Sequence, residues 1–395
     1  MNIINKIRII AFLVLLVSQS YTQDLKSIRK VNEYIQQQIE QKKIAGAVIL
    51  VSQNDRILMH KSYGYQDIQD NIPMDTSSIF RIYSMTKPLT SLSIMMLVDR
   101  GEISLEDSIV TYLPELKNLK VLEGKKESKL NREIKIRDLL RHSSGFAYGG
   151  GLGFSKVDRL YNKKHPLLVA DGNDMINRLA QLPLLCHPGE EYHYSISVDV
   201  LGVIVERVSK MKLSDFMTKN IFKPLGMVDT YFKLPESKKE RFCSIYGIGL
   251  KLKESYKITE YINDRMEEGG GGLVSTSSDY LKFCSLLLNK GIYNSDTLIS
   301  PLLIAEMTKN QLPIGVGLYK LDNEVAIGFG FGFSINLQEL GQHGHKGDFG
   351  WSGIGGTHFT ISPKKKLVLI IMTQKQPFSP KIKNNLTPII LNGID

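Results

Sequence analysis

The sequence predicts an α/β protein in which one sheet is assembled from both ends of the chain, with a mainly helical insert between them. Strand patterns occur near the N-terminus, at 45–67, and again in the last third of the chain. The residues between them show the 3.6-residue apolar period of helices. At 395 residues, the chain can bury a substantial core. We therefore expect a sheet domain built from about 23–84 and 291–395, and a mainly helical region at about 85–290.

The N-terminus has the pattern of a secretory signal peptide, predicted at 1–22. Lys6 and Arg8 precede the apolar run 9–17, and small residues follow near Thr22. The apolar run is too short to cross a bilayer as a helix. We expect cleavage near Thr22, an exported mature chain that is periplasmic or secreted, and no integral membrane span after cleavage. A retained N-terminal anchor is the alternative.

The first elements after this segment are one helix, two strands and a second helix. Apolar residues at helical spacing predict a helix over 25–43, and strands follow at 45–53 and 56–67 around a polar turn. Residues 85–100 form a helix that is apolar on nearly all sides, which is typical of a helix inside a large protein. Gly101 then ends it.

The middle of the chain is predicted to be helix and loop, and the end to be strands. Helices are expected within 134–145, 197–210 and 277–291, strands at 324–336, 356–362 and 366–374, and a final helix near 380–393. Two glycine-rich segments, 148–154 and 269–272, do not follow a strand in the pattern that holds a phosphate, so we interpret both as tight turns.

Charge and cysteine content exclude several classes of protein. The net charge is +10, but the lysines gather in polar stretches without interleaved aromatic residues, so no nucleic-acid partner is expected. The three cysteines, Cys186, Cys243 and Cys284, are far apart and form no CxxC pair. They are expected to be small buried apolar residues rather than disulfides, zinc ligands or redox groups. No cofactor is expected.

A Ser-x-x-Lys pair at Ser84 and Lys87 is the first candidate for chemistry. The same spacing occurs elsewhere, but only Ser84 combines a helix start, a buried helix behind it and a lysine on the same face. The positive helix end can stabilise an oxyanion at the serine. The same helix end and an apolar wall would disfavour the lysine ammonium, leaving a neutral base. The alternative is that Ser84 caps the helix and Lys87 reaches solvent. The three other pairs are Ser27/Lys30, Ser209/Lys212 and Ser362/Lys365.

The segment around Ser84 resembles the first motif of the β-lactamase-related serine hydrolases. These include class C β-lactamases, D-Ala-D-Ala carboxypeptidases and the family VIII esterases, to which the similarity is greatest. The resemblance covers nearly all of the mature chain. It implies an α/β sandwich domain plus an all-α domain, with an antiparallel sheet flanked by helices, the β-lactamase/transpeptidase-like fold. The motifs that carry it are 80–98, 136–145, 188–209, 269–283 and 349–363.

The resemblance implies a catalytic set of Ser84, Lys87 and Tyr194. Tyr194 matches the tyrosine of the second motif, and it would carry protons to and from the nucleophile and the leaving group. Whether Lys87 or Tyr194 first takes the serine proton stays open. Tyr261, in the literal Tyr-x-Asn of 261–263, is a second candidate whose surroundings do not match.

Trp351, Ser352, Gly353 and Ile354 occupy the third motif, where lactam-processing members often carry Lys-Thr-Gly. The resemblance makes them the strand that lines the substrate cleft. Gly353 would allow a substrate close to the backbone. The Ile354 N–H would join that of Ser84 in an oxyanion hole. Trp351 is either an apolar wall for the acyl group or an ordinary partly buried aromatic residue. Ser352 is a poor nucleophile candidate because its surroundings differ from a Gly-x-Ser-x-Gly elbow.

These expectations combine into an exported serine hydrolase that acts through an acyl-enzyme on a small-molecule ester or amide. By this resemblance, Ile196 stands in place of an amide that contacts the substrate in β-lactamases, and Trp351 in place of a cation that would bind the carboxylate of a β-lactam or peptide. Because both contacts are lost, a carboxylesterase for short or medium acyl esters is favoured. The alternatives are a class C-like β-lactamase or D-alanyl-D-alanine carboxypeptidase, and a non-catalytic relative that binds cell-wall fragments. His343 and His345 gain no third ligand by spacing, so no metal is expected.

Overall fold

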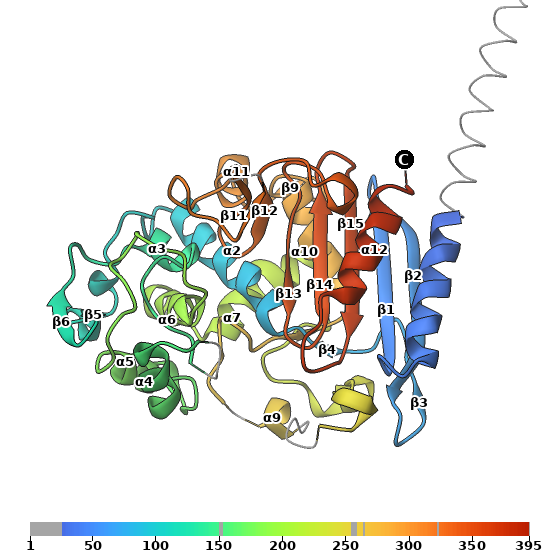
Figure 1. Cartoon of the computed structure of the whole chain (residues 1–395), viewed down its shortest axis with the longest axis horizontal. Helices are drawn as coiled ribbons and strands as arrows, with labels where there is room; N and C mark the ends of the chain where they lie inside the picture. Colours follow the sequence, from blue (N-terminus) through green and yellow to red (C-terminus); the bar gives the residue numbers. More distant parts are fainter. Residues whose placement is uncertain (1–25, 150–152, 254–258, 264, 322–323, 395) are drawn as a thin grey trace, which may run out of the picture.

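The computed structural model describes residues 26–149, 153–253, 259–263, 265–321 and 324–394. The predicted signal peptide, 1–22, lies outside the described residues. Figure 1 shows a large sheet with helices on both faces and a group of helices and loops beside it. No helix within the described ranges is long and apolar enough to cross a membrane.

A nine-stranded antiparallel sheet joins the two ends of the chain, in the order β10-β11-β12-β13-β14-β15-β1-β2-β3. The central pairing sets Ala47 of β1 opposite Thr373 of β15. The prediction of a single sheet from both ends of the chain is confirmed. The strands are β1 Gly46–Gln53, β2 Arg56–Asp67, β3 Ile72–Pro73, β10 Tyr319–Leu321, β11 Glu324–Phe329, β12 Ser334–Asn336, β13 Phe349–Gly353, β14 Thr357–Ser362 and β15 Leu367–Thr373.

The central strands are buried on both faces, because successive side chains alternate between two cores. In β1, Val48 and Leu50 belong to the main core, whereas Ala47, Ile49 and Val51 belong to a second one. Helices α2 (Thr86–Asp99) and α10 (Ser277–Leu288) cover the first face. A helix that includes residues 26–40 and α12 (Lys381–Leu391) cover the other (Figure 1).

Helix α2 is the buried scaffold that its composition predicts. Every residue from Thr86 to Leu97 is buried, and Gly101 follows with a φ of +69°. The predicted strand 324–336 is wrong in its middle, where the chain leaves the sheet between β11 and β12. There Gly332, with a φ of +99°, passes so close to α2 that a Cβ atom would lie 2.7 Å from Ser91 Oγ. This close approach explains the glycine.

The middle of the chain is mostly helix and loop, as expected, although α10 packs against the sheet rather than within the helical group. All three cysteines are free and buried, which confirms their predicted burial. The remaining helices are α3 Ile136–Leu140, α4 Lys156–Lys164, α5 Gly172–Leu179, α6 Ser197–Ser209, α7 Leu213–Met217, α8 Lys223–Leu225, α9 Thr259–Ile262 and α11 Pro301–Met307. Short strand pairs are β4 Phe80–Arg81 with β7 Val274–Ser275, β5 Lys120–Glu123 with β6 Lys126–Lys129, and β8 Ile292–Tyr293 with β9 Asp296–Thr297.

Candidate active site

Ser84 lies in a tight 3-10 turn, Tyr83–Met85, that joins β4 to α2. The turn is sharp because Tyr83 has a φ of +44°, a conformation that costs energy for a residue other than glycine. Met85 occupies the N-cap position of α2 and no side chain caps it. Ser84 therefore does not act as the helix cap, and its half-buried hydroxyl is held at the positive end of a buried helix.

Lys87 is completely buried on the first turn of α2 and faces Ser84. Its ammonium donates to Gly270 O at 2.7 Å and lies 3.5 Å from Ser84 Oγ. The ammonium also lies 4.7 Å from the ring centre of Tyr194 and 5.3 Å from that of Tyr148. The interpretation in which Lys87 extends into solvent is therefore wrong.

The expectation of a neutral lysine is also wrong for this site. Burial alone would lower the pKa of Lys87, but the nearby oxygens of Tyr148, Tyr194 and Asp199 outweigh burial and raise the pKa above its usual range. The ammonium form is thus retained. The local sequence shows only the helix end and the apolar wall, because Tyr148, Tyr194 and Asp199 come from distant segments.

Tyr194 joins Ser84 and Lys87, and Tyr148 lies beside it. The two tyrosine rings stack with centres 5.6 Å apart and planes inclined by 17°. Burial raises the pKa of Tyr148 despite the opposing effect of Lys87, so this phenol stays protonated. The sequence offers little signal for Tyr148, because it begins the glycine-rich segment 148–154, whose pattern predicts only a tight turn.

Asp199 and the glycine turn 269–272 form the floor beneath Lys87. Asp199 Oδ1 accepts a hydrogen bond of 2.8 Å from the Gly270 N–H, and the Gly270 carbonyl accepts from Lys87. A Cβ atom at Gly270 would lie 2.4 Å from Asp199 Oδ2. The turn was predicted, but its contact with Lys87 was not. An acidic residue on the buried face of a helix, five positions after Tyr194, was the available clue.

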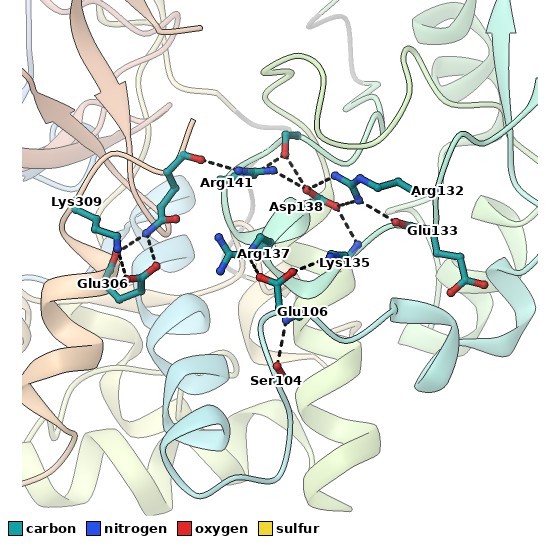
Figure 2. Close-up of polar contacts among 12 residues, drawn as sticks. Ser104, Glu106, Arg132, Glu133, Lys135, Arg137, Asp138, Arg141, Glu306 and Lys309 are labelled. Atoms are coloured by element: carbon teal, nitrogen blue, oxygen red, sulfur yellow. Dashed lines mark hydrogen bonds and ion pairs between the residues drawn. The ribbon is translucent and has the colours of Figure 1, made fainter. Parts of the chain in front are cut away.

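An ion-pair network behind the site positions His142, whose ring centre lies 4.7 Å from that of Tyr194. Figure 2 shows the fully buried Asp138 between Arg132 and Arg141. Its carboxylate accepts from Arg132 at 2.6 and 3.0 Å and from Arg141 at 2.9 Å. The Asp138 carbonyl accepts from the Ser143 N–H, next to His142. The network therefore fixes the turn on which the His142 ring rests against Tyr194.

The third-motif strand, β13, divides its side chains between the two faces of the sheet. Trp351 points toward Tyr194, and its indole N–H donates to the phenol oxygen at 3.4 Å. Ser352 points the other way and pairs with His358 Nδ1 at 2.8 Å. The assignment of the Ser352 side chain to the substrate site is therefore wrong. Glycine is required at position 353 because a Cβ atom there would lie 2.4 Å from Ile82 O. The close contact is therefore with the protein backbone, whereas the expectation was a close approach of substrate. Ile354, which follows, is exposed.

The orientation of Ser352 gives a testable expectation. Ser352→Ala should keep ester turnover within about threefold of the wild type, a barrier change of about 0.7 kcal/mol. The variant should lose about 1–3 kcal/mol of stability, because a buried imidazole nitrogen loses its partner. Steady-state kinetics and urea unfolding measure the two effects. A large loss of turnover in a stable Ser352→Ala protein would instead indicate that this side chain contacts the substrate.

The remaining candidates are Tyr261, Ile196 and the histidines at 343 and 345. Tyr261 packs against Phe242 in a separate core cluster. Ile196 is fully buried, at the N-cap position of α6. His345 pairs with Glu339 at 2.9 Å. The ligand atoms of one group, comprising Cys186, Glu191 and His193, all lie within 4.8 Å of one another, with the exposed Glu191 carboxylate already bonded to His193.

The chain is similar to known proteins in sequence and in fold. A family model described as Beta-lactamase matches residues 31–389. Protein Rv1367c of Mycobacterium tuberculosis is 32% identical over 351 residues, covering 85% of this chain and 86% of the relative. Esterase EstB of Burkholderia gladioli is 27% identical over 372 residues, covering 85% and 88%. The solved structure of EstCE1, a hydrolase with promiscuous acyltransferase activity, has a TM-score of 0.80 at 22% identity and covers 93% of this chain and 99% of its own.

Proposed function

Because the chain belongs to the beta-lactamase family, we propose that this serine hydrolase is a carboxylesterase that cleaves esters of short or medium acyl chains. The coarser class, a serine hydrolase with the β-lactamase/transpeptidase-like fold, follows from the family and the fold. The finer proposal, an esterase acting through Ser84, is supported by the geometry around Lys87 and by the likeness to an esterase.

In the proposed reaction, Ser84 is the nucleophile and Tyr194 moves the proton. Ser84 Oγ bonds to the ester carbonyl carbon as its proton passes to the Tyr194 oxygen, which this scheme requires in its phenolate form. The bond to the alcohol oxygen then breaks, and the alcohol leaves with that proton. Water attacks the acyl-enzyme in the same way, releasing the acid and restoring the serine hydroxyl.

Lys87 has an electrostatic role in this scheme. Its raised pKa keeps it an ammonium, which makes Tyr194 rather than Lys87 the proposed first base. The ammonium lies between Ser84 Oγ and the Tyr194 ring, where it stabilises negative charge on either oxygen. Backbone N–H groups of Ser84 and Ile354 are the proposed oxyanion donors.

The contact between Trp351 and Tyr194 is the observation that favours esters over β-lactams or peptides. An indole stands where lactam-processing members of the family often present a lysine, and it faces the proposed base. The ring is half-buried and packs on Phe329 with centres 5.2 Å apart. An apolar wall of this kind contacts an uncharged acyl group and offers no partner to a carboxylate.

A paired rate assay on the purified protein tests the proposal. Turnover of a short-chain nitrophenyl ester is compared with that of a chromogenic cephalosporin, with Ser84→Ala as the blank. We expect ester turnover that disappears in the blank, with little cephalosporin cleavage. Fast cephalosporin cleavage would instead identify a β-lactamase. Ester turnover that survives in Ser84→Ala would remove Ser84 as the nucleophile, and no turnover of either substrate would favour a binding protein.

Export is part of the proposal and has its own test. The supporting observation is the basic and apolar pattern of residues 1–22. Mass spectrometry of the protein from its native cells should give a chain that begins near Gln23. An intact Met1 in a cytoplasmic fraction would contradict export.

A further inference from the structure

A cavity of about 370 Å³ lies on the face of the sheet opposite Ser84. Its lining residues come from the end of the helix that includes residues 26–40, the β13–β14 hairpin and the first turn of α12, among others. Ser352 and His358 line its wall, as do Thr357 and Thr373. This volume falls in the usual range for small-molecule sites and is larger than a single inorganic ion requires.

Four lysines converge on this cavity: Lys43, Lys375, Lys381 and Lys383. They come from three separate segments of the chain, so the tertiary fold brings them together. None of the residues that line the cavity is acidic, and no ion pair within the described ranges involves any of the four.

Lys375 lies close enough to Lys43 and Lys381 for their charges to repel it. Burial lowers the pKa of Lys375, and the neighbouring charges of Lys43 and Lys381 lower it further. Lys383 is half-buried, and burial lowers its pKa as well. Positive charges gathered without a counter-charge cost free energy, and an anion in the cavity would remove that cost.

The wall of the cavity adds neutral polar groups. His358 is buried, and burial followed by the charge of Lys383 holds its pKa well below the usual range, so the ring is neutral. Its two nitrogens pair with Ser352 Oγ at 2.8 Å and Thr360 Oγ1 at 2.7 Å. The neutral ring therefore adds no positive charge of its own, and the lysines supply the charge of the cavity.

We propose that this cavity binds the phosphate group of a small phosphorylated organic molecule. A phosphate monoester carries about two negative charges and three acceptor oxygens, which suits several lysines better than a single carboxylate does. The space beyond the charged head would take the organic part. Because Ser352 lines this cavity while Trp351 of the same strand faces Tyr194, the occupant and the proposed substrate would contact opposite faces of β13.

Calorimetric titration and thermal unfolding of the full protein test this site, with ionic strength held constant by sodium chloride. The probes are inorganic phosphate and glycerol 3-phosphate. Both should raise the unfolding temperature, with glycerol 3-phosphate binding more tightly. The double variant Lys375→Gln/Lys383→Gln should bind each probe at least about tenfold more weakly than the wild type does. Without ligand, its unfolding temperature should be equal to that of the wild type or higher. The exposed pair Lys43→Gln/Lys381→Gln gives a second test that leaves the packing intact.

Lys117→Gln/Lys125→Gln, two exposed lysines far along the chain from the cavity residues, is the charge-matched control and should bind as the wild type does. An equal response of all four proteins would reveal general screening and overturn the proposal, as would the absence of any response to both probes. Vesicles of phosphatidylglycerol, compared with phosphatidylcholine, distinguish the source of the phosphate. Lysine-dependent vesicle binding without binding of the soluble probes would overturn the small-molecule site and assign the lysines to a lipid surface.

Discussion

Lys87→Met is expected to reduce kcat/KM for a short-chain ester by about 10³-fold or more, close to the effect of Ser84→Ala. The ammonium is fully buried, bonded to Gly270 O at 2.7 Å, and adjacent to both Ser84 Oγ and the Tyr194 ring. Methionine keeps the length and packing of the side chain but removes the charge that stabilises the developing anions. Steady-state kinetics on protein checked for folding by circular dichroism measure the effect.

Two comparisons make this test specific. Lys30→Met changes the lysine of the equally spaced Ser27/Lys30 pair, which is exposed on the helix that includes residues 26–40, and should leave kcat/KM unchanged. The double variant Ser84→Ala/Lys87→Met should be no slower than either single variant, because the residues act as one unit. A folded Lys87→Met protein with near-normal kcat/KM would refute the role of the ammonium.

Asp138→Asn is expected to cost about 3 kcal/mol of folding free energy at neutral pH, as removal of one partner from a buried ion pair usually does. Asp138 is fully buried and accepts from Arg132 and Arg141, of which Arg141 is itself largely buried. Asparagine fills the same space but leaves both cations uncompensated. The change is measured by urea unfolding followed by tryptophan fluorescence.

The effect of Asp138→Asn should also depend on pH. Burial would raise the pKa of Asp138, but the hydrogen bonds and charges of Arg132 and Arg141 outweigh it and lower the pKa. The stability that the carboxylate contributes is therefore fully present above the unfolded-state pKa of about 4 and is lost as pH falls through the lower folded-state pKa. The difference between wild type and variant should be constant near neutrality and shrink in acid.

Asp70→Asn is the matched control, since Asp70 is exposed. It should change the unfolding free energy by no more than about 0.5 kcal/mol. An Asp138→Asn protein as stable as this control would show that the network in Figure 2 contributes little, and that packing alone holds the 142–145 turn.

Local patterns in the sequence determined much of the architecture. A helix apolar on nearly all sides has almost no solvent face, so the sequence predicts that α2 is buried and that Ser84 and Lys87 lie near one another at its start. The apolar strands at both ends of the chain had to pair, because an isolated strand cannot satisfy its backbone groups inside a core. Tyr194 entered through the resemblance, and the structure places it beside Lys87.

Only the tertiary structure decided the charge of Lys87, the partners beneath it and the direction of Ser352. The pKa of Lys87 depends on Tyr148, Tyr194 and Asp199, which reach it from far along the chain, and electrostatic energies depend on distance in space rather than in sequence. Trp351 and Ser352 are neighbours, yet the pleat of β13 sends them to opposite faces. The tertiary fold also brings four lysines from three segments to one cavity. No local sequence pattern predicts this cluster.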